Sequence, residues 1–274
     1  MLRPLRIAVL RLEGLERLQA ATEALAARLL EGRLQAGMVV GSTMVDGVLY
    51  GLYEAGWGPR AYRRITGGPK ASLRPDTVYA GIVYASESLE ETVQAAETIV
   101  ECLGAKNWGA TRMGPRRLAA GIIEVVGDYS PDQALECTRI ALRKPRPQTL
   151  DQSTLPIDRL SKPYLHPKWR NYTGADPLPC KGAARRGDYM VRIGLSLWED
   201  TFIADARIDG VFNAAPPMEP FSTLAGITGM PVGEQALLAL ETRFSAKIEL
   251  HGITPEDVVE AFRKAIESRP RKAP

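Results

Sequence analysis

Prolines constrain the fold of this 274-residue chain more than any other feature. Between positions 145 and 187 they recur too often for a long helix or strand, because proline fixes φ and lacks a backbone N–H donor. The residues on either side carry the hydrophobic patterns of regular elements. We therefore expect two folded units, 1–144 and 188–274, connected by a proline-rich linker or covering arm over 145–187. These prolines are Pro145, Pro147, Pro156, Pro163, Pro167, Pro177 and Pro179.

The first unit alternates apolar runs with helical patterns. Leucines and alanines recur every three or four residues from Leu15 onward, which predicts a helix that packs on a sheet and ends at Gly32 or Gly37. Ser88 and Glu91 match a capping box at a helix start. This order predicts an α/β fold, a mixed β-sheet flanked by helices. Further helices are expected at 47–56, 88–104 and 130–144, and strands at 5–12, 37–42, 60–65, 77–86 and 116–129, the last as one strand or a pair.

The second unit begins with a predicted β-hairpin. Apolar positions alternate on both sides of a turn at Glu199 and Asp200. Helical stretches follow at 219–228 and 233–243, then a strand at 245–250. Thr254, Pro255 and Asp257 match the start of a last helix. This order predicts a small α+β C-terminal domain.

Charge and residue usage exclude several classes of function. The formal net charge of +3 is too small to favour nucleic acid as a partner. Charged residues interrupt the apolar residues of the amino terminus, so we expect neither a signal peptide nor a membrane span. We therefore expect a cytoplasmic protein. Three cysteines without a close pair and two histidines predict no metal site. Cys102 and Cys137 are expected to be buried, unreactive thiols.

The segment "YRRITGGPKASLR" (62–74) is a basic, glycine-containing loop. Gly67 and Gly68 allow positive φ and a close approach of the backbone to a ligand. Arg63 and Arg64 are adjacent on a strand, so their side chains point to opposite faces and only one shares the side of the loop. A phosphate or carboxylate could bind here, but an ordinary basic hairpin explains the same residues equally well.

A second short pattern is "KNWG" (106–109), between a predicted helix and a predicted strand. Lys106 in that position could neutralise a phosphate or polarise a carboxyl group. Trp108 could line an apolar acyl tunnel, although packing is the more usual role of such a tryptophan. Taken alone, Lys106 also fits a solvated surface lysine.

The two patterns together resemble the lipoate–protein ligase family of the biotin and lipoate ligase superfamily, and "ARIDGVF" in the second unit resembles a turn of that family's accessory domain. The resemblance implies ATP- and Mg²⁺-dependent activation of lipoate or octanoate to acyl-AMP, and transfer to a lysine of a lipoyl-domain protein. It implies a catalytic role for Lys106. The residues that it assigns to substrate and nucleotide binding are Arg64, Thr66, Gly67, Gly68, Lys70 and Gly109.

Departures from the family pattern leave other functions open. Pro69 and Lys70 stand where the family has glycine and alanine, so the loop lacks one backbone donor. One alternative is a non-catalytic homologue that binds lipoate or acyl chains, or acts as an accessory subunit. The other is a cysteine-dependent octanoyl or lipoyl transferase, with Cys180 beside Lys181 as the nucleophile.

Overall fold

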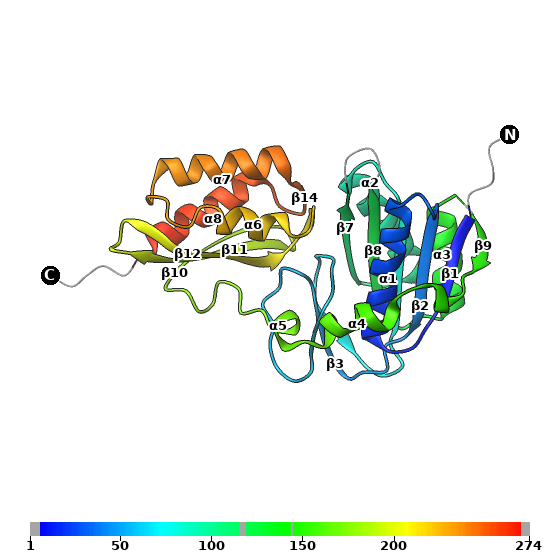
Figure 1. The fold of residues 1–274 in the computed structure, drawn as a ribbon. Coiled ribbons are helices and arrows are strands. Elements are labelled where there is room, and N and C mark those ends of the chain that lie inside the picture. Colours follow the sequence, from blue (N-terminus) through cyan, green and yellow to red (C-terminus); the bar gives the residue numbers. More distant parts are fainter. Residues whose placement is uncertain (1–5, 115–118, 144, 270–274) are drawn as a thin grey trace.

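The largest sheet is six-stranded and mixed (Figure 1). The structure is a computed structural model, and it describes residues 6–114, 119–143 and 145–269. The strand order is β7-β8-β6-β2-β1-β9, with β1 parallel to β2 and β9 and the other pairs antiparallel. This confirms the expected mixed sheet. Its strands are β1 (Arg6–Arg11), β2 (Ala36–Ser42), β6 (Val78–Ala85), β7 (Asn107–Met113), β8 (Ala120–Gly127) and β9 (Arg146–Thr149).

Helices cover both faces of this sheet. Alternate residues of a strand face opposite sides, so Met38 packs in one core and Val39 in the other. Helix α1 (Leu15–Leu30) covers the face of Val39, and α2 (Leu89–Leu103) and α3 (Pro131–Ala141) cover the face of Met38. The start of the strand expected at 116–129 and the end of the helix expected at 130–144 lie outside the described residues.

Local capping chemistry sets the ends of these helices. The Ser88 hydroxyl accepts a hydrogen bond from the Glu91 N–H, and Gly104 ends α2 in the left-handed conformation. The Glu91 carboxylate accepts from the Glu87 N–H, not from Ser88. Ser130 and Gln133 form a complete capping box at the start of α3.

The expected helix at 47–56 is wrong. Residues Gly47–Tyr50 form strand β3, which lies between β4 (Ala61–Arg63) and β5 (Ala71–Leu73) in a small three-stranded sheet. Pairing on both edges satisfies the backbone of β3, and this long-range pairing overrides the local helical pattern. The segment from Arg64 to Lys70, which we call the ligand loop, connects β4 to β5.

The proline-rich arm has more regular structure than expected. It contains a short 3₁₀ turn (Gln152–Thr154), α4 (Ile157–Leu165) and α5 (Pro167–Arg170). Pro163 lies inside α4. The arm nevertheless forms these helices because Tyr164, only 4% exposed, anchors α4 on the core beneath α1.

The C-terminal unit, residues 180–269, contains a three-stranded antiparallel sheet. Its strands are β10 (Cys180–Arg186), β11 (Tyr189–Trp198) and β12 (Phe202–Val211). The β11–β12 hairpin turns at Glu199 and Asp200 as expected. Strand β10 lies within the range expected for the arm, although it pairs with β11 through a tight turn at Gly187 and Asp188, a local hairpin signal that the prediction did not use. The remaining elements are β13 (Asn213–Ala215), α6 (Glu219–Ala225), α7 (Glu234–Lys247), β14 (Glu249–His251) and α8 (Pro255–Glu267).

Helix α7 extends four residues beyond its predicted end, so the first half of the strand expected at 245–250 is helical, and only its last two residues lie in a strand, β14. Helix α8 starts with the predicted capping box of Thr254 and Asp257. Within the described part of the chain, no helix is both long and apolar enough to cross a membrane.

A disulfide connects α2 to α3. Cys102 and Cys137 are bonded, with their Cα atoms 5.7 Å apart. The expectation of two free, buried thiols is therefore wrong, because the packing of α2 on α3 brings together residues that the sequence separates by 35 positions. Disulfides are rare in the cytoplasm outside hyperthermophiles. The predicted cytoplasmic location stays a prediction.

Reduction of this disulfide should destabilise the protein. Chain entropy for a loop of this length gives a loss of about 3 to 4 kcal/mol in the free energy of unfolding. Urea unfolding with and without reductant measures the loss. A Cys102→Ser/Cys137→Ser variant should have the same free energy of unfolding as the reduced protein, with or without reductant. Cys180→Ala should still lose stability on reduction. Equal stability of oxidised and reduced protein would contradict this expectation.

Candidate functional site

Arg64 lies at the centre of the ligand loop. Its side chain is fully buried, and burial lowers the pKa of the guanidinium. Nε donates to the carbonyl of Gly67 at 2.9 Å, and Nη2 donates to the carbonyls of Pro69 at 2.7 Å and Trp108 at 2.9 Å. Nη1 is buried and has no hydrogen-bond partner within the described part of the chain. A buried cation with a free donor can bind an anionic oxygen.

Arg63 points away from the loop, as strand alternation predicts. Its Nη1 donates to the carbonyls of Gly51, Leu52 and Glu54, and its guanidinium lies 5.1 Å from the centre of the Tyr172 ring. Burial lowers the pKa of Arg63 to about 10. Arg64 is therefore the arginine that shares the side of the loop.

The glycines of the loop are required by close contacts with other backbone segments. A Cβ on Gly67 would lie 1.9 Å from the carbonyl oxygen of Phe212, and one on Gly68 would lie 2.1 Å from that of Trp108. Gly68 also has a φ of 81°. On β7, a Cβ on Gly109 would lie 2.2 Å from the Gly67 oxygen. The loop, β7 and the end of β12 thus meet at one point.

One backbone donor of the loop is already occupied by protein. The Gly68 N–H donates to the carbonyl of Phe212 at 3.1 Å. The sequence suggested that such N–H groups could face an anion. In this arrangement the C-terminal unit takes that hydrogen bond instead.

Glu124 on β8 is a site residue that sequence reasoning missed. Its side chain is fully buried. The Thr66 N–H and hydroxyl donate to Oε2 at 2.9 and 2.6 Å, and the Tyr79 hydroxyl donates to Oε1 at 2.6 Å. The carboxylate thereby fixes Thr66 and the start of the glycine pair. A single acidic residue inside the apolar run "GIIEVVG" was the available signal, because buried carboxylates require partners.

The structure brings together only part of the predicted site. Arg64, Thr66, Gly67, Gly68 and Gly109 lie against one another. Lys106, directly before β7, and Lys70, at the end of the loop, are exposed. In the residues that the structure describes, no group of three or more His, Cys, Asp or Glu residues could hold a metal ion.

Cys180 lies apart from this group. It starts β10 and packs in the core of the C-terminal unit, with 3% of its surface exposed. Burial raises the pKa of its thiol. A buried, protonated thiol is a poor nucleophile.

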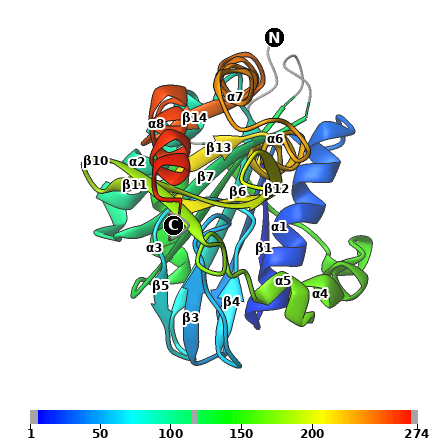
Figure 2. The ribbon, with the colours of Figure 1, turned by 90° about the vertical axis from the view of Figure 1, so that its left-hand side faces the viewer.

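The C-terminal unit is bound to β7 beside the loop (Figure 2). The Ala110 N–H donates to Asn213 Oδ1 at 2.9 Å, and the Thr111 hydroxyl donates to the Ala214 carbonyl at 2.7 Å. Glu249 of β14 pairs with Arg112 and also accepts from the Leu89 N–H at the start of α2. These bonds hold the two units in one fixed relation around the ligand loop.

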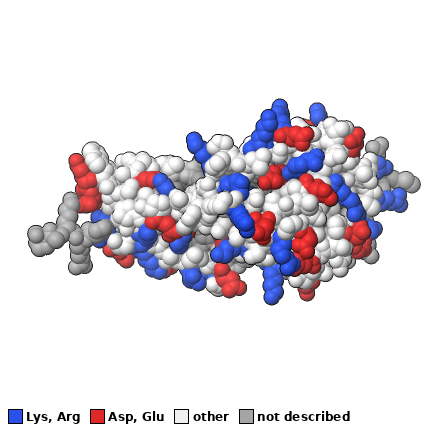
Figure 3. Space-filling view, turned by 90° about the horizontal axis from the view of Figure 1, so that it is seen from below, with Lys and Arg blue, Asp and Glu red and all other residues white. Residues whose placement is uncertain are grey.

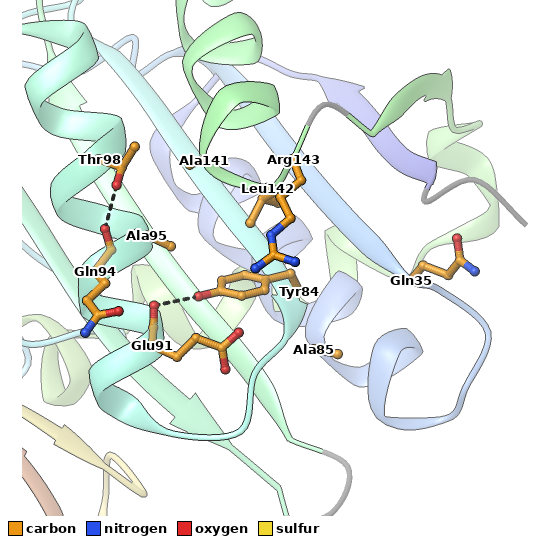
Figure 4. Close-up of a pocket in the computed structure, with 10 residues that line it drawn as sticks. All are labelled: Gln35, Tyr84, Ala85, Glu91, Gln94, Ala95, Thr98, Ala141, Leu142 and Arg143. Atoms are coloured by element: carbon orange, nitrogen blue, oxygen red, sulfur yellow. Dashed lines mark hydrogen bonds between the residues drawn. The ribbon is translucent and has the colours of Figure 1, made fainter. Parts of the chain in front are cut away.

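A separate cavity of about 440 Å³ lies between α2 and α3 (Figure 4). Tyr84 projects into it and donates from its hydroxyl to the Glu91 carbonyl. None of the predicted site residues lines it. The cavity is lined by Gln35, Tyr84, Ala85, Glu91, Gln94, Ala95, Thr98, Ala141, Leu142 and Arg143.

Comparison with known proteins gives the fold. No family model and no curated protein matches the sequence. The crystal structure of P. falciparum LipL1 in complex with lipoate is similar over 91% of this chain and 96% of its own, with a TM-score of 0.59 and 9% identity. Two other solved structures match less closely. T. acidophilum protein Ta0514 with bound lipoic acid covers 61% of this chain and 99% of its own, at a TM-score of 0.43 and 14% identity. The structure of lipoate-protein ligase A bound with ATP covers 61% of this chain and 98% of its own, at a TM-score of 0.44 and 13% identity.

The latter two structures, with TM-scores of 0.43 and 0.44, do not by themselves establish a shared fold. The first spans both units and shows that this chain shares the fold of LipL1. The expected fold class is therefore confirmed, and the family resemblance holds at the level of the fold.

Removal of the Glu124 carboxylate should loosen the loop. Glu124→Ala leaves the Thr66 N–H and the Tyr79 hydroxyl buried without an acceptor, so the free energy of unfolding should fall by about 3 kcal/mol or more. Glu124→Gln keeps an oxygen that can accept from Thr66, so its free energy of unfolding should fall by roughly half as much. Urea unfolding of both variants measures the difference. No loss of stability in Glu124→Ala would show that the hydrogen bonds to Glu124 do not stabilise the protein.

Proposed function

We propose that this protein is a lipoate–protein ligase-like enzyme, which activates lipoate or octanoate with ATP and transfers the acyl group to a lysine of a lipoyl-domain protein. Two observations support the proposal. The fold resembles that of a protein whose structure holds lipoate, over nearly the whole chain. Arg64, fully buried, has an unpartnered Nη1 beside the glycine pair. This free cationic donor is the observation that carries the proposal.

The chemistry requires stabilisation of negative charge and no histidine. A lipoate carboxylate oxygen attacks the α-phosphate of ATP, which enters as its Mg²⁺ complex, and pyrophosphate leaves. The acceptor lysine amine then attacks the acyl carbonyl, and AMP leaves. Both steps place negative charge on oxygen. A guanidinium in a low-dielectric site stabilises such charge more strongly than one in water.

Each predicted residue has a distinct part in this mechanism. Arg64 would donate from Nη1 to a carboxylate or phosphate oxygen. Thr66, held by Glu124, would position the glycine pair, and Gly109 would allow the loop to lie against β7. Lys106 lies three residues before Gly109, about 10 Å along an extended chain. Its exposed side chain is free to bind the α-phosphate or the carboxylate, with exposed Lys70 as a second cation.

A second candidate function is a non-catalytic lipoate-binding or accessory homologue. The hydrogen bond from Gly68 to the Phe212 carbonyl favours it, because the donor is already satisfied by protein. The cysteine-dependent transferase has weaker support. Cys102 and Cys137 form a disulfide and Cys180 is buried, so no cysteine offers an accessible thiolate.

Acyl-adenylate formation tests the enzyme. Purified protein with lipoate, ATP and Mg²⁺ should release pyrophosphate and yield lipoyl-AMP, detected by mass spectrometry. Lys106→Ala should reduce the rate about 100-fold or more, because a cation at the reacting centre is lost. Lys181→Ala removes an exposed lysine of β10 and serves as the matched control, with an unchanged rate.

The outcomes separate the two candidate functions. Lipoate binding by calorimetry without any lipoyl-AMP would favour the non-catalytic homologue. If Lys106→Ala forms lipoyl-AMP at the same rate as the control, the protein is an enzyme as proposed, but Lys106 has no part in its mechanism. The absence of both lipoate binding and lipoyl-AMP formation would overturn the proposed function.

A further inference from the structure

Basic side chains surround a cavity on the outer side of the arm. The cavity has a volume of about 610 Å³ and lies over α4 and α5. We call its lining the arm surface. Trp169 and Pro163 give it an apolar part. The whole arm surface consists of Arg159, Lys162, Pro163, His166, Lys168 and Trp169.

The cations of the arm surface have no acidic partners among the residues that the structure describes. Arg159, Lys162 and Lys168 are exposed, and in the described part of the chain none of them forms an ion pair. Residues 159–175 contain no Asp or Glu. Asp158, just before them, lies 3.7 Å from Arg17 on α1. On the face that Figure 3 shows, basic and acidic side chains are interspersed, so the absence of acidic residues from 159–175 is a local feature. The arm surface therefore attracts negative charge locally, although the whole chain has a net charge of only +3.

The arm surface is anchored to the strand that leads into the ligand loop. Trp169 Nε1 donates to the Arg63 carbonyl at 3.1 Å, and Arg170 Nε donates to the Ala61 carbonyl at 2.7 Å. On the other side, the Tyr164 hydroxyl donates to Glu23 of α1 at 3.0 Å. A partner bound to the arm surface is therefore held at a fixed position relative to Arg64.

The composition of the arm surface suits a protein partner. Leu165, which precedes the lining residue His166 in the sequence, is 53% exposed, and Trp169 packs edge-on against Tyr164. Exposed apolar residues inside a rim of cations are typical of protein interfaces. Single-stranded nucleic acid would instead require exposed aromatic faces for stacking.

We infer that the arm surface docks an acidic face of the acceptor protein during acyl transfer. The inference rests on the proposed function and adds to it where the acceptor binds and what charge it presents. Complementary charge accelerates encounter and orients the partner, so the effect should appear in acceptor binding and not in adenylation.

A charge-neutralised variant tests the inference. Arg159→Gln/Lys162→Gln/Lys168→Gln removes three exposed cations and leaves the core intact. The probe is a purified apo lipoyl domain of net negative charge. Its KM in the transfer reaction should rise about tenfold at low ionic strength, while the rate of lipoyl-AMP formation stays unchanged. The difference from wild type should shrink at high salt, where exposed charges are screened.

A matched control carries the same change of charge elsewhere. Arg185→Gln/Lys247→Gln/Arg263→Gln alters three exposed cations of the C-terminal unit that form no ion pair within the described residues. This control should keep the wild-type KM. Equal KM values in both triple variants and in wild type would overturn the inference while leaving the ligase proposal intact.

Direct binding keeps the test independent of catalysis. The dissociation constant of the lipoyl domain, measured by calorimetry, should also rise about tenfold in the arm variant alone. This measurement stands even if the protein makes no lipoyl-AMP, which would count against the proposed function instead. Loss of binding to double-stranded DNA or anionic vesicles, with unchanged affinity for the lipoyl domain, would assign the surface to another class of partner and overturn the inference.

Discussion

The buried guanidinium of Arg64 holds the candidate site together. Three carbonyl oxygens, from Gly67, Pro69 and Trp108, converge on it. Such carbonyls repel one another unless a donor lies between them, and the planar fork of arginine can bond to several at once, whereas a lysine ammonium is a single point. Arg64 thereby bends the loop on itself and ties it to β7. Its remaining Nη1 is buried and has no hydrogen-bond partner among the described residues.

The close contacts that build the site also limit access to it. Gly67 approaches the Phe212 carbonyl, and the Gly68 N–H donates to the same oxygen. A ligand that uses this N–H has to replace Phe212 as the acceptor. A phosphate or carboxylate can do so, because a charge-assisted hydrogen bond is roughly twice as strong as one to a neutral carbonyl. Any ligand at this N–H therefore has to compete with the C-terminal unit for the hydrogen bond.

Sequence reasoning succeeded where a structure depends on neighbouring residues. The caps at Ser88 and Thr254 and the turn at Glu199 and Asp200 each involve residues within three positions of one another. It failed where the partner is distant. Strand β3 at 47–50 looked helical because both of its sheet neighbours lie further along the chain, and the bond between Cys102 and Cys137 depends on the packing of two helices.

The sequence by itself determined most of the alternation of helices and strands, the α/β class, and the glycine loop with its arginine. These follow from local backbone preferences and hydrophobic periodicity. Tertiary structure alone decided that Arg64 and not Arg63 serves the loop, that Glu124 fixes Thr66, and that Phe212 closes on Gly68. The physical reason is that hydrogen bonds between residues 44 or more positions apart exist only after packing has brought their strands together.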